Sequence, residues 1–443
     1  MEFEIYSDNF YDKLDEHLVK VEDENKDVPF LTKEEYDKQQ RIVEQFLAEK
    51  KLKIYGGVAL DKFMPEDDKI YLNREGKIVD YDVYSPQPLK DAVELVNRLY
   101  EAGFKYVTLR EGVNAGVYKI FNYFQEAADV VYMPQRIYDL IPAKKIGDLW
   151  YVEPRHLRID LLVALTNPKQ GIFRWKKDFE RLEKLEKYFP VEKPIKFCES
   201  VGQQYAPSNL EVRIQDYLEK RDDYILFGDM AYYAFMRESG LKDYFKPEVK
   251  YLEIGMEKPA SIFDDLKRLG RIKIRRYHQF MKHIPTRYIV TPQNQDTHIL
   301  LIIYELNEKC IPYVDYKGAK ITTYHGLVLY YNFMIYLSGR YGIRDREQIS
   351  RCCLYELDRA KKYYFKNSGQ DEFGDNLFRC FILPCLGKEK NVLRESKIRV
   401  WSSGKTKQKP FTYVPATREH LVVESKVPAG YVKFISGELD REV

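Results

Sequence analysis

The chain has 443 residues, of which 44% are hydrophobic and 32% charged, and its formal net charge is +3. This length and composition indicate a globular protein of two or three domains. They exclude a membrane-spanning protein, because no stretch approaches the roughly 18 apolar residues of a span. The acidic start is also unlike a signal or transit peptide, so we expect no membrane partner.

The first part of the chain alternates helix and strand signals. Residues 1–50 hold 15 acids against 7 Lys and Arg, and a capping-box pattern at 32–35 predicts the start of a helix. A short strand should end at Gly56-Gly57 and lead into a helix, and Asp80-Tyr81-Asp82 should open a second strand. A stripe of apolar residues predicts a further helix over 88–102.

Several strands and one amphipathic helix should follow. The helix covers 172–188, and the expected strands are 106–109, 117–123, 128–133 and 159–165. A strand–helix–strand–helix start followed by a run of strands implies an α+β or mixed-sheet domain. We place this domain at residues 51–195, after an acidic N-terminal helical region at 1–50.

The second half of the chain echoes the first. Residues 225–235 match residues 53–63 as a strand, a glycine turn and an apolar helix start, and the aspartate strand recurs from Tyr251. In this match Asp80 falls on Lys250 and Asp82 on Leu252. We interpret the two stretches as copies of one unit, the second without its metal ligands. The alternative is a chance likeness of short apolar segments. The second domain is placed at 196–325, and a helical C-terminal region with a basic tail at 326–443.

Basic residues gather in two places. Residues 266–287 hold eight Lys and Arg and no acid, and residues 388–409 hold eight more against two acids. Such runs suit an anionic polymer lying along the surface, whereas a solvated helix face and a charged tail are the alternatives. The candidate RNA-binding residues are Lys267, Arg268, Arg271, Lys273, Arg275 and Arg276.

The six cysteines show neither zinc-ligand spacing nor the density of a disulfide scaffold. We therefore expect buried, reduced thiols and a reducing compartment.

Asp80 and Asp82 carry the strongest chemical signal. Residues i and i+2 of a strand point to the same face, and the glycine pair forms a backbone turn that a phosphate can approach. Two carboxylates beside such a turn suit a nucleoside triphosphate carried on divalent metal. Asp129, in an otherwise apolar strand, is the predicted third acid, and Asp160 is the runner-up. A structural salt bridge is the alternative for both.

These residues resemble the DNA polymerase β-type nucleotidyltransferases. Four phrases narrow the resemblance: Tyr-Gly-Gly-Val-Ala-Leu-Asp (55–61), Asp-Tyr-Asp-Val-Tyr-Ser-Pro (80–86), Ala-Asp-Val-Val-Tyr-Met-Pro (128–134) and Trp-Lys-Lys-Asp-Phe-Glu-Arg-Leu (175–182). They are similar to the poly(A) polymerase catalytic subunits of large cytoplasmic DNA viruses, in the asfarvirus and mimivirus branch more than the poxvirus one. The resemblance covers residues 40–190 and, more weakly, 220–335.

The resemblance implies an α+β protein with a nucleotidyltransferase-fold catalytic domain, a degenerate copy of it and a helical, basic C-terminal region. It implies that Gly56 and Gly57 hold the triphosphate of ATP and that Asp80, Asp82 and Asp129 are catalytic ligands of Mg²⁺ or Mn²⁺. AMP would be added to the 3′ end of RNA. The family's basic helix corresponds to four candidate triphosphate contacts, for which a solvated face is the alternative: Arg174, Lys176, Lys177 and Arg181.

The resemblance leaves partners and alternatives open. Related proteins imply either a homodimer or a separate processivity subunit, and a location in the cytoplasmic viral factory or the virion. The core motif also permits another nucleotidyltransferase, one that adds CCA to tRNA or modifies a small molecule. A third possibility is a non-catalytic RNA-binding subunit with a relict fold.

Overall fold

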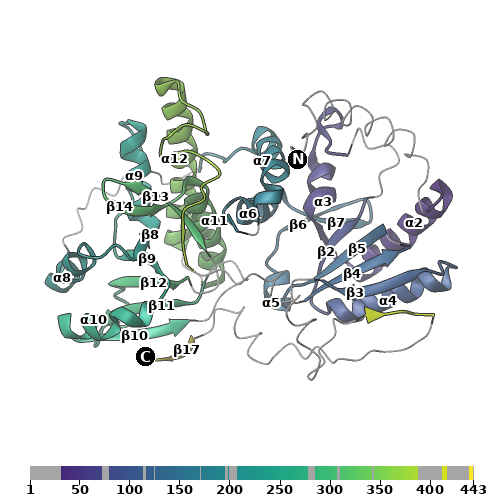
Figure 1. Ribbon diagram of the computed structural model, residues 1–443, viewed down its shortest axis with the longest axis horizontal. Helices are drawn as coiled ribbons and strands as arrows, with labels where there is room; N and C mark the ends of the chain where they lie inside the picture. Colours follow the sequence, from purple (N-terminus) through teal and green to yellow (C-terminus); the bar gives the residue numbers. More distant parts are fainter. Residues whose placement is uncertain are drawn as a thin grey trace, which may run out of the picture. The chain divides into compact units, whose positions relative to one another are not determined.

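The computed structural model describes residues 31–71, 79–112, 116–123, 125–169, 171–194, 198, 207–277, 285–306, 310–341, 344–387, 412–416 and 439–442. The chain divides into two compact units, Met1–Glu153 with Ser402–Glu424, and Pro154–Trp401 with Ser425–Val443 (Figure 1). In the described ranges, no helix has both the length and the apolar character needed to cross a bilayer.

The described part of the first unit is built on an eight-stranded sheet in the order β16-β3-β4-β5-β2-β1-β7-β6. The central strands are β1 (Lys53–Tyr55), β2 (Tyr81–Ser85) and β5 (Gln125–Tyr132). β1 runs antiparallel to β2, and β2 runs parallel to β5. The flanking strands are β3 (Val107–Glu111), β4 (Val117–Asn122), β6 (Ala143–Ile146), β7 (Leu149–Val152) and β16 (Thr412–Tyr413).

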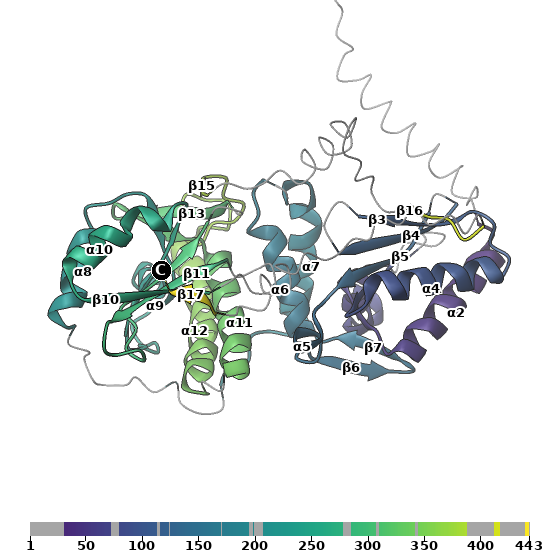
Figure 2. The same ribbon diagram turned by 90° about the horizontal axis from the view of Figure 1, so that it is seen from below.

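Two long helices pack on one face of this sheet. α2 (Lys33–Lys50) begins at the predicted capping box, in which Thr32 and Glu35 bond each other's backbone amides. α4 (Pro88–Glu101) lies along β3, β4 and β5 and buries its apolar stripe against them (Figure 2). Asp82 and Asp129 alternate with the fully buried Val83 and Val130, so both acids belong to the other face.

Shorter helices complete the first unit. α3 (Gly56–Phe63) starts directly at the end of β1, and its Gly57, Ala59 and Leu60 are buried. The others are η1 (Glu66–Asp68) and α5 (Gln135–Tyr138). The chain thus turns from a central strand into a helix at the glycine pair, as the sequence predicts.

The described part of the second unit repeats the central strand order of the first and adds β15 at one edge. Its described sheet has the order β15-β13-β14-β8-β9-β12-β11-β10-β17. β8 (Tyr224–Leu226) is antiparallel to β9 (Leu252–Met256), which is parallel to β12 (Leu301–Glu305). The remaining strands are β10 (Ile272–Tyr277), β11 (Arg287–Pro292), β13 (Ile311–Tyr316), β14 (Ala319–Thr322), β15 (Cys385–Leu386) and β17 (Leu439–Glu442). The internal echo therefore reflects two copies of one supersecondary unit.

The helices of the second unit surround this sheet and pack on one another. α11 (Tyr324–Tyr341) and α12 (Arg344–Ser368) lie side by side, and both contact α9 (Gly228–Ser239). They confirm the helices predicted beyond residue 325. The others are α6 (Pro154–Leu165), η2 (Ile172–Arg174), α7 (Trp175–Tyr188), α8 (Asn209–Leu218), η3 (Pro259–Ile262) and α10 (Phe263–Leu269). By its contacts, the segment of α6 and α7 belongs with this second unit; the functional boundary at residue 195 stays a prediction.

One predicted strand is wrong. Residues 159–165, expected as a strand, form the second half of α6, which begins at Pro154. This helix buries residues on several sides, among them His156, Arg158 and Leu161, so its sequence lacks the exposed polar stripe that marks most helices. Asp160 consequently lies on a helix and not on a strand.

The expectation of reduced cysteines is also wrong. Cys198 pairs with Cys352, and Cys310 pairs with Cys385, across 154 and 75 residues of sequence. Cys353 and Cys380 are buried and free. Only the tertiary fold brings the paired residues together, so spacing in the sequence gave no sign of them. The cysteines therefore no longer support a reducing compartment.

The disulfides predict a thiol count. Protein purified without reductant and then unfolded should react with Ellman's reagent at two thiols per chain, which correspond to Cys353 and Cys380. Reduction should lower the melting temperature, because each disulfide restrains the unfolded chain and typically contributes about 2–4 kcal/mol. A Cys353→Ser variant is the control and should lose one reactive thiol without losing stability on this scale. Six reactive thiols in the unreduced protein would contradict the pairing.

Candidate functional site

The Asp82 carboxylate lies directly against the backbone of Gly56. Register places Asp82 beside Tyr55, the last residue of β1, and Gly56 then turns the chain into α3 with a φ of +71°. A Cβ atom on Gly56 would stand 2.4 Å from Oδ2 of Asp82. Only glycine leaves room here for the acid and also adopts this left-handed conformation at no cost.

Asp129 stands next to Asp82 across the parallel strand pair, since the two are register partners. Asp129 is buried, and its Oδ2 accepts a hydrogen bond from Lys119 Nζ at 2.7 Å. Its Oδ1 is buried and accepts no hydrogen bond from the described residues. Burial raises the pKa of the Asp129 carboxyl to about 8, although the Lys119 ammonium opposes this shift. A buried carboxylate with one vacant oxygen is a good ligand for an added cation.

The predicted third member of the acid group, Asp80, comes directly before β2 and two residues before Asp82. Within the described residues, no three His, Cys, Asp or Glu side chains already converge closely enough to hold a metal ion. Two features nevertheless fit a divalent cation. One is Oδ1 of Asp129, which has no hydrogen bond from the described residues, and the other is the close approach of the Gly56 backbone to the Asp82 carboxylate, here called the glycine cradle. Ligation of the cation by Asp80, Asp82 and Asp129 stays a prediction.

The start of α3 supplies groups for an anion beside these acids. The first amides of a helix have no partner within the helix and carry a partial positive charge. No side chain caps the start of α3, and its first two residues are Gly56 and Gly57, which let a ligand approach the backbone. A phosphate bound here would lie next to Asp82.

The four candidate triphosphate contacts lie around the start of α7, in the second unit. Lys176 and Lys177 are exposed, and Arg174 pairs with Asp178 at 3.1 Å. Arg181 is only 7% exposed, so it belongs to the interior of this helix pair more than to its surface. Their part in nucleotide binding stays a prediction.

The basic run of residues 266–287 occupies α10 and β10. Lys267, Arg268 and Arg271 are exposed. Lys273 and Arg275 both approach Asp296, a neighbour that sequence order did not reveal, and Arg276 has a buried Nε. Arg268 also pairs with Asp265 at 3.1 Å while it stays exposed, so Lys267, Arg268 and Arg271 form the exposed part of the predicted RNA surface. Residues 278–284 and the run at 388–409 lie outside the described residues.

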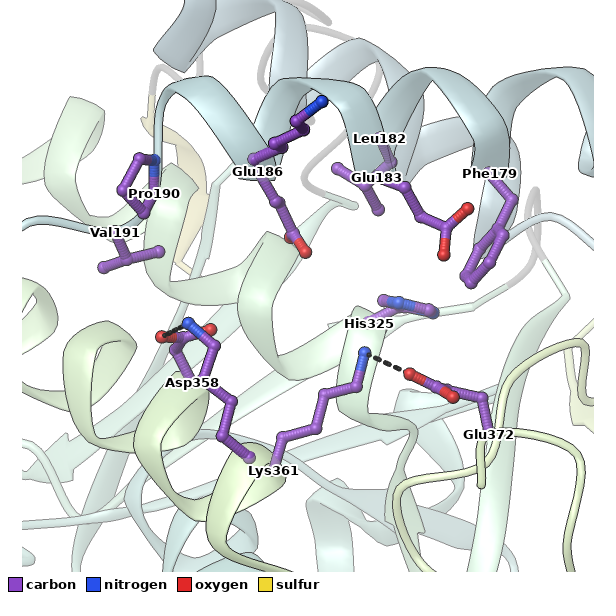
Figure 3. Close-up of a pocket in the computed structure, with 12 residues that line it drawn as sticks. Phe179, Leu182, Glu183, Glu186, Pro190, Val191, His325, Asp358, Lys361 and Glu372 are labelled. Atoms are coloured by element: carbon purple, nitrogen blue, oxygen red, sulfur yellow. Dashed lines mark hydrogen bonds and ion pairs between the residues drawn. The ribbon is translucent and has the colours of Figure 1, made fainter. Parts of the chain in front are cut away.

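A separate cavity of about 360 Å³ lies among α7, α11 and α12 (Figure 3). Lys361 pairs with Glu372 at 3.3 Å and Lys362 with Asp358 at 2.7 Å at its wall. Burial lowers the pKa of His325 to about 3, so this imidazole is neutral. The cavity is lined by none of the predicted catalytic residues, and these two ion pairs neutralise four of its charged side chains.

The second unit contains the counterpart of the acid site, one residue away from the predicted match. Phe227 precedes Gly228 as Tyr55 precedes Gly56, and Gly228 also has a positive φ, of +60°. A Cβ atom on Gly228 would stand 2.5 Å from Oε2 of Glu253. Glu253 therefore corresponds to Asp82, in place of the predicted Leu252, and by the same register Tyr251 corresponds to Asp80, in place of Lys250. The predicted match missed this because the loops before the two strands differ in length.

An arginine supplies the cation of this second site. Arg346 on α12 donates to Asp229 Oδ2 at 2.8 Å and to the Tyr330 hydroxyl at 2.9 Å, and its Nη2 lies 4.0 Å from Glu253 Oε1. Ile302 occupies the position of Asp129 opposite Glu253. Burial raises the pKa of Glu253 to about 7. The copy keeps a glycine cradle and one strand acid, but an internal guanidinium occupies its charged centre.

Two of these residues were absent from the sequence prediction. Lys119 stands alone among apolar residues in Val117-Tyr118-Lys119-Ile120-Phe121, and a lone lysine in an otherwise apolar strand was an available signal. Arg346 gave no such signal, because it reaches Asp229 across 117 residues of sequence.

The part of the chain that holds Asp82 and Asp129 is similar to known proteins. Residues 41–171 match the family model described as poly(A) polymerase catalytic subunit. A protein named as a poly(A) polymerase catalytic subunit of Acanthamoeba polyphaga mimivirus is 24% identical over 89% of this chain and 75% of its own length. The counterpart from African swine fever virus (isolate Pig/Kenya/KEN-50/1950) is 35% identical over 34% of this chain, and the match spans only a third of that protein.

A solved structure confirms the fold class. The Megavirus polyadenylate synthase aligns over 100% of this chain and 94% of its own, with a TM-score of 0.81 and 21% identity. The predicted α+β architecture and the resemblance to this viral family are thereby confirmed.

The buried arginine yields a test of the second site. Replacing Arg346 with Met should destabilise the second unit by about 3–5 kcal/mol, because it leaves the Asp229 and Glu253 carboxylates buried without a cation. Chemical denaturation measures the loss in free energy of unfolding, and hydrogen exchange shows whether α9 and β9 are the elements that lose protection. Arg351→Met on the same helix is the control, since Arg351 is 38% exposed and pairs only with Glu347 one turn away; it should cost less than about 1 kcal/mol. Equal effects of the two variants would contradict the assignment.

Proposed function

We propose that this protein is a template-independent polynucleotide adenylyltransferase, which transfers AMP from ATP to the 3′ hydroxyl of RNA and releases pyrophosphate. The observation that carries the proposal is the juxtaposition of three features: Asp82 and Asp129 on neighbouring parallel strands, and the open glycine start of α3 beside them. The viral relatives named as poly(A) polymerase catalytic subunits share this region of the chain.

The geometry gives each residue a task in the transfer. The backbone at Gly56 and Gly57 holds the triphosphate next to Asp82, and Asp129 lies on the side away from the glycines, where the acceptor hydroxyl enters. The 3′ oxygen forms a bond to the α-phosphorus while the bond to pyrophosphate breaks. Phosphoryl transfer depends on such positioning and on charge neutralisation more than on covalent chemistry by the protein. Two Mg²⁺ or Mn²⁺ ions held by Asp80, Asp82 and Asp129 would neutralise the charge on the attacking and leaving oxygens.

Substrate and setting follow from the relatives and from surface charge. ATP and RNA are the substrates that the relatives' names imply, and Lys267, Arg268 and Arg271 offer exposed positive charge for an RNA backbone. Arg174, Lys176 and Lys177 are proposed as further triphosphate contacts. A viral factory or virion is the proposed setting, and a homodimer or a processivity subunit is the proposed assembly.

The acids give the first test of this function. Asp82→Asn and Asp129→Asn should each lower AMP transfer to a labelled RNA primer by at least about 100-fold, because each removes a carboxylate that would hold the metal that neutralises transition-state charge. The assay offers each of the four nucleotides in Mg²⁺ and in Mn²⁺. Asp67→Asn, at an exposed carboxylate of the same unit, is the control and should leave the rate unchanged.

The outcomes separate the alternatives. Transfer of CMP and AMP only to tRNA ends, or of AMP only to a small molecule, would indicate another nucleotidyltransferase. RNA binding without any transfer by the wild-type protein would indicate a non-catalytic subunit. Full activity of Asp82→Asn would place the reaction elsewhere.

The glycine cradle gives a second test with a matched control. Gly56→Ala should abolish transfer while the fold persists, because the new Cβ would collide with the Asp82 carboxylate and displace it. Gly103→Ala has the same kind of backbone strain, with a φ of +101°, but meets no atom within 4 Å. Its activity should therefore stay near that of wild type despite a comparable loss of stability. If both variants lose activity equally, backbone strain explains the loss and the cradle does not.

A further inference from the structure

The row of register partners that contains Asp82 and Asp129 continues across the sheet to basic and aromatic residues. Register pairs Asp82 with Asp129, Asp129 with Lys119, and Lys119 with Arg110 on β3. Because register partners point to the same face, Arg110 shares a face with the catalytic acids. At about 4.8 Å per strand, it lies two strands, or roughly 10 Å, beyond Asp129.

Arg110 is the unengaged cation of this row. Lys119 is committed to Asp129 and Glu126, whereas Arg110 is exposed and has no ion pair with any described residue. Its guanidinium lies over the ring of Phe121, 5.2 Å from the ring centroid. A cation held over a half-exposed ring offers one contact to a phosphate and another to a base.

Two tyrosines stand directly beyond the ends of these strands, Tyr106 before β3 and Tyr123 after β4, where Tyr123 turns the chain with a φ of +56°. Phe121 pairs with Thr108, and the next pair along is Tyr106 and Tyr123, where the Tyr123 amide donates to the Tyr106 carbonyl. Their rings lie 5.0 Å apart, and Tyr106 is 61% exposed. Tyr123 follows Phe121 by two residues, so this ring pair lies at the end of the strand pair that carries Phe121. Val107 and Asn122, the neighbouring register pair, are buried, and Asn122 Nδ2 donates to Gln39 Oε1 on α2 at 2.8 Å.

We infer that Tyr106, Arg110, Phe121 and Tyr123, here called the acceptor surface, bind the 3′-terminal nucleotides of the single-stranded acceptor RNA. Arg110 contacts a phosphate, and the rings stack on bases. This inference rests on the proposed adenylyl transfer. RNA is favoured over ATP as the occupant, because the surface adjoins Asp129 on the side away from Gly56, where the triphosphate is proposed to bind. Single-stranded bases are required, since aromatic side chains reach only unpaired bases.

The direct test is RNA binding without catalysis. Fluorescence anisotropy of a labelled oligonucleotide that ends in a 3′-deoxynucleotide measures affinity with no nucleotide present. Tyr106→Ala should weaken binding by about 5-fold or more through lost stacking. Arg110→Gln should weaken binding and lower the slope of log Kd against log salt by about 0.7, the value for one phosphate contact on a single strand. Tyr100→Ala and Arg41→Ala, on α4 and α2, are the controls and should match wild type.

Steady-state kinetics distinguish this inference from its rivals. Arg110→Gln and Tyr106→Ala should raise the KM for RNA and leave the KM for ATP unchanged, with thermal melting to show that both variants fold. Unchanged RNA affinity in both variants would overturn the inference, as would a rise in the KM for ATP alone. Failure of the proposed function is separate, because it would appear as absence of transfer by the wild-type protein whatever the binding data show.

Discussion

The close approach of the Gly56 backbone to the Asp82 carboxylate is the constraint on which the candidate site depends. The positive φ of Gly56 ends β1 and starts α3 in one step, so the free amides of a helix start lie beside a strand acid. An anion site and a cation ligand thereby share one small space. Any side chain at this position would separate them.

In the second unit, a cation of the protein itself lies beside the matching glycine and strand acid. Gly228 and Glu253 reproduce the cradle, and Asp229 adds a second carboxylate where the first unit has Gly57. Buried carboxylates need a cation, and Arg346 provides it from α12. In the first unit, Lys119 satisfies one oxygen of Asp129 and leaves the other vacant. The same fold thus carries one site closed by the protein's own cation and one site with room for an added one.

Local patterns in the sequence predicted the parts of the site that lie close together along the chain. The strand pattern placed Asp82, the glycine pair placed the turn, and an isolated acid in an apolar strand placed Asp129 beside Asp82, whereas Asp80 comes before β2 and its part in the site stays a prediction. Features that depend on distant contacts escaped prediction: the disulfides, the Arg346 centre and the pairing of Arg275 with Asp296. The helix α6 was mistaken for a strand because burial on several sides removes its polar stripe. The one-residue shift at Glu253 arose because the sequence match took the glycine-to-strand spacing to differ by two residues between the copies, whereas strand register gives a difference of one.

We propose that the Asp82–Asp129 face holds divalent metal together with a triphosphate. Electron paramagnetic resonance of Mn²⁺, titrated into the protein with a non-hydrolysable ATP analogue, tests it without reliance on turnover. We expect the wild-type protein to bind Mn²⁺ with a signal that shows coupling to a phosphorus nucleus. We expect the Asp129→Asn variant to lose this binding. Mn²⁺ binding that is absent from the wild-type protein, or unchanged in the Asp129 variant, would contradict it.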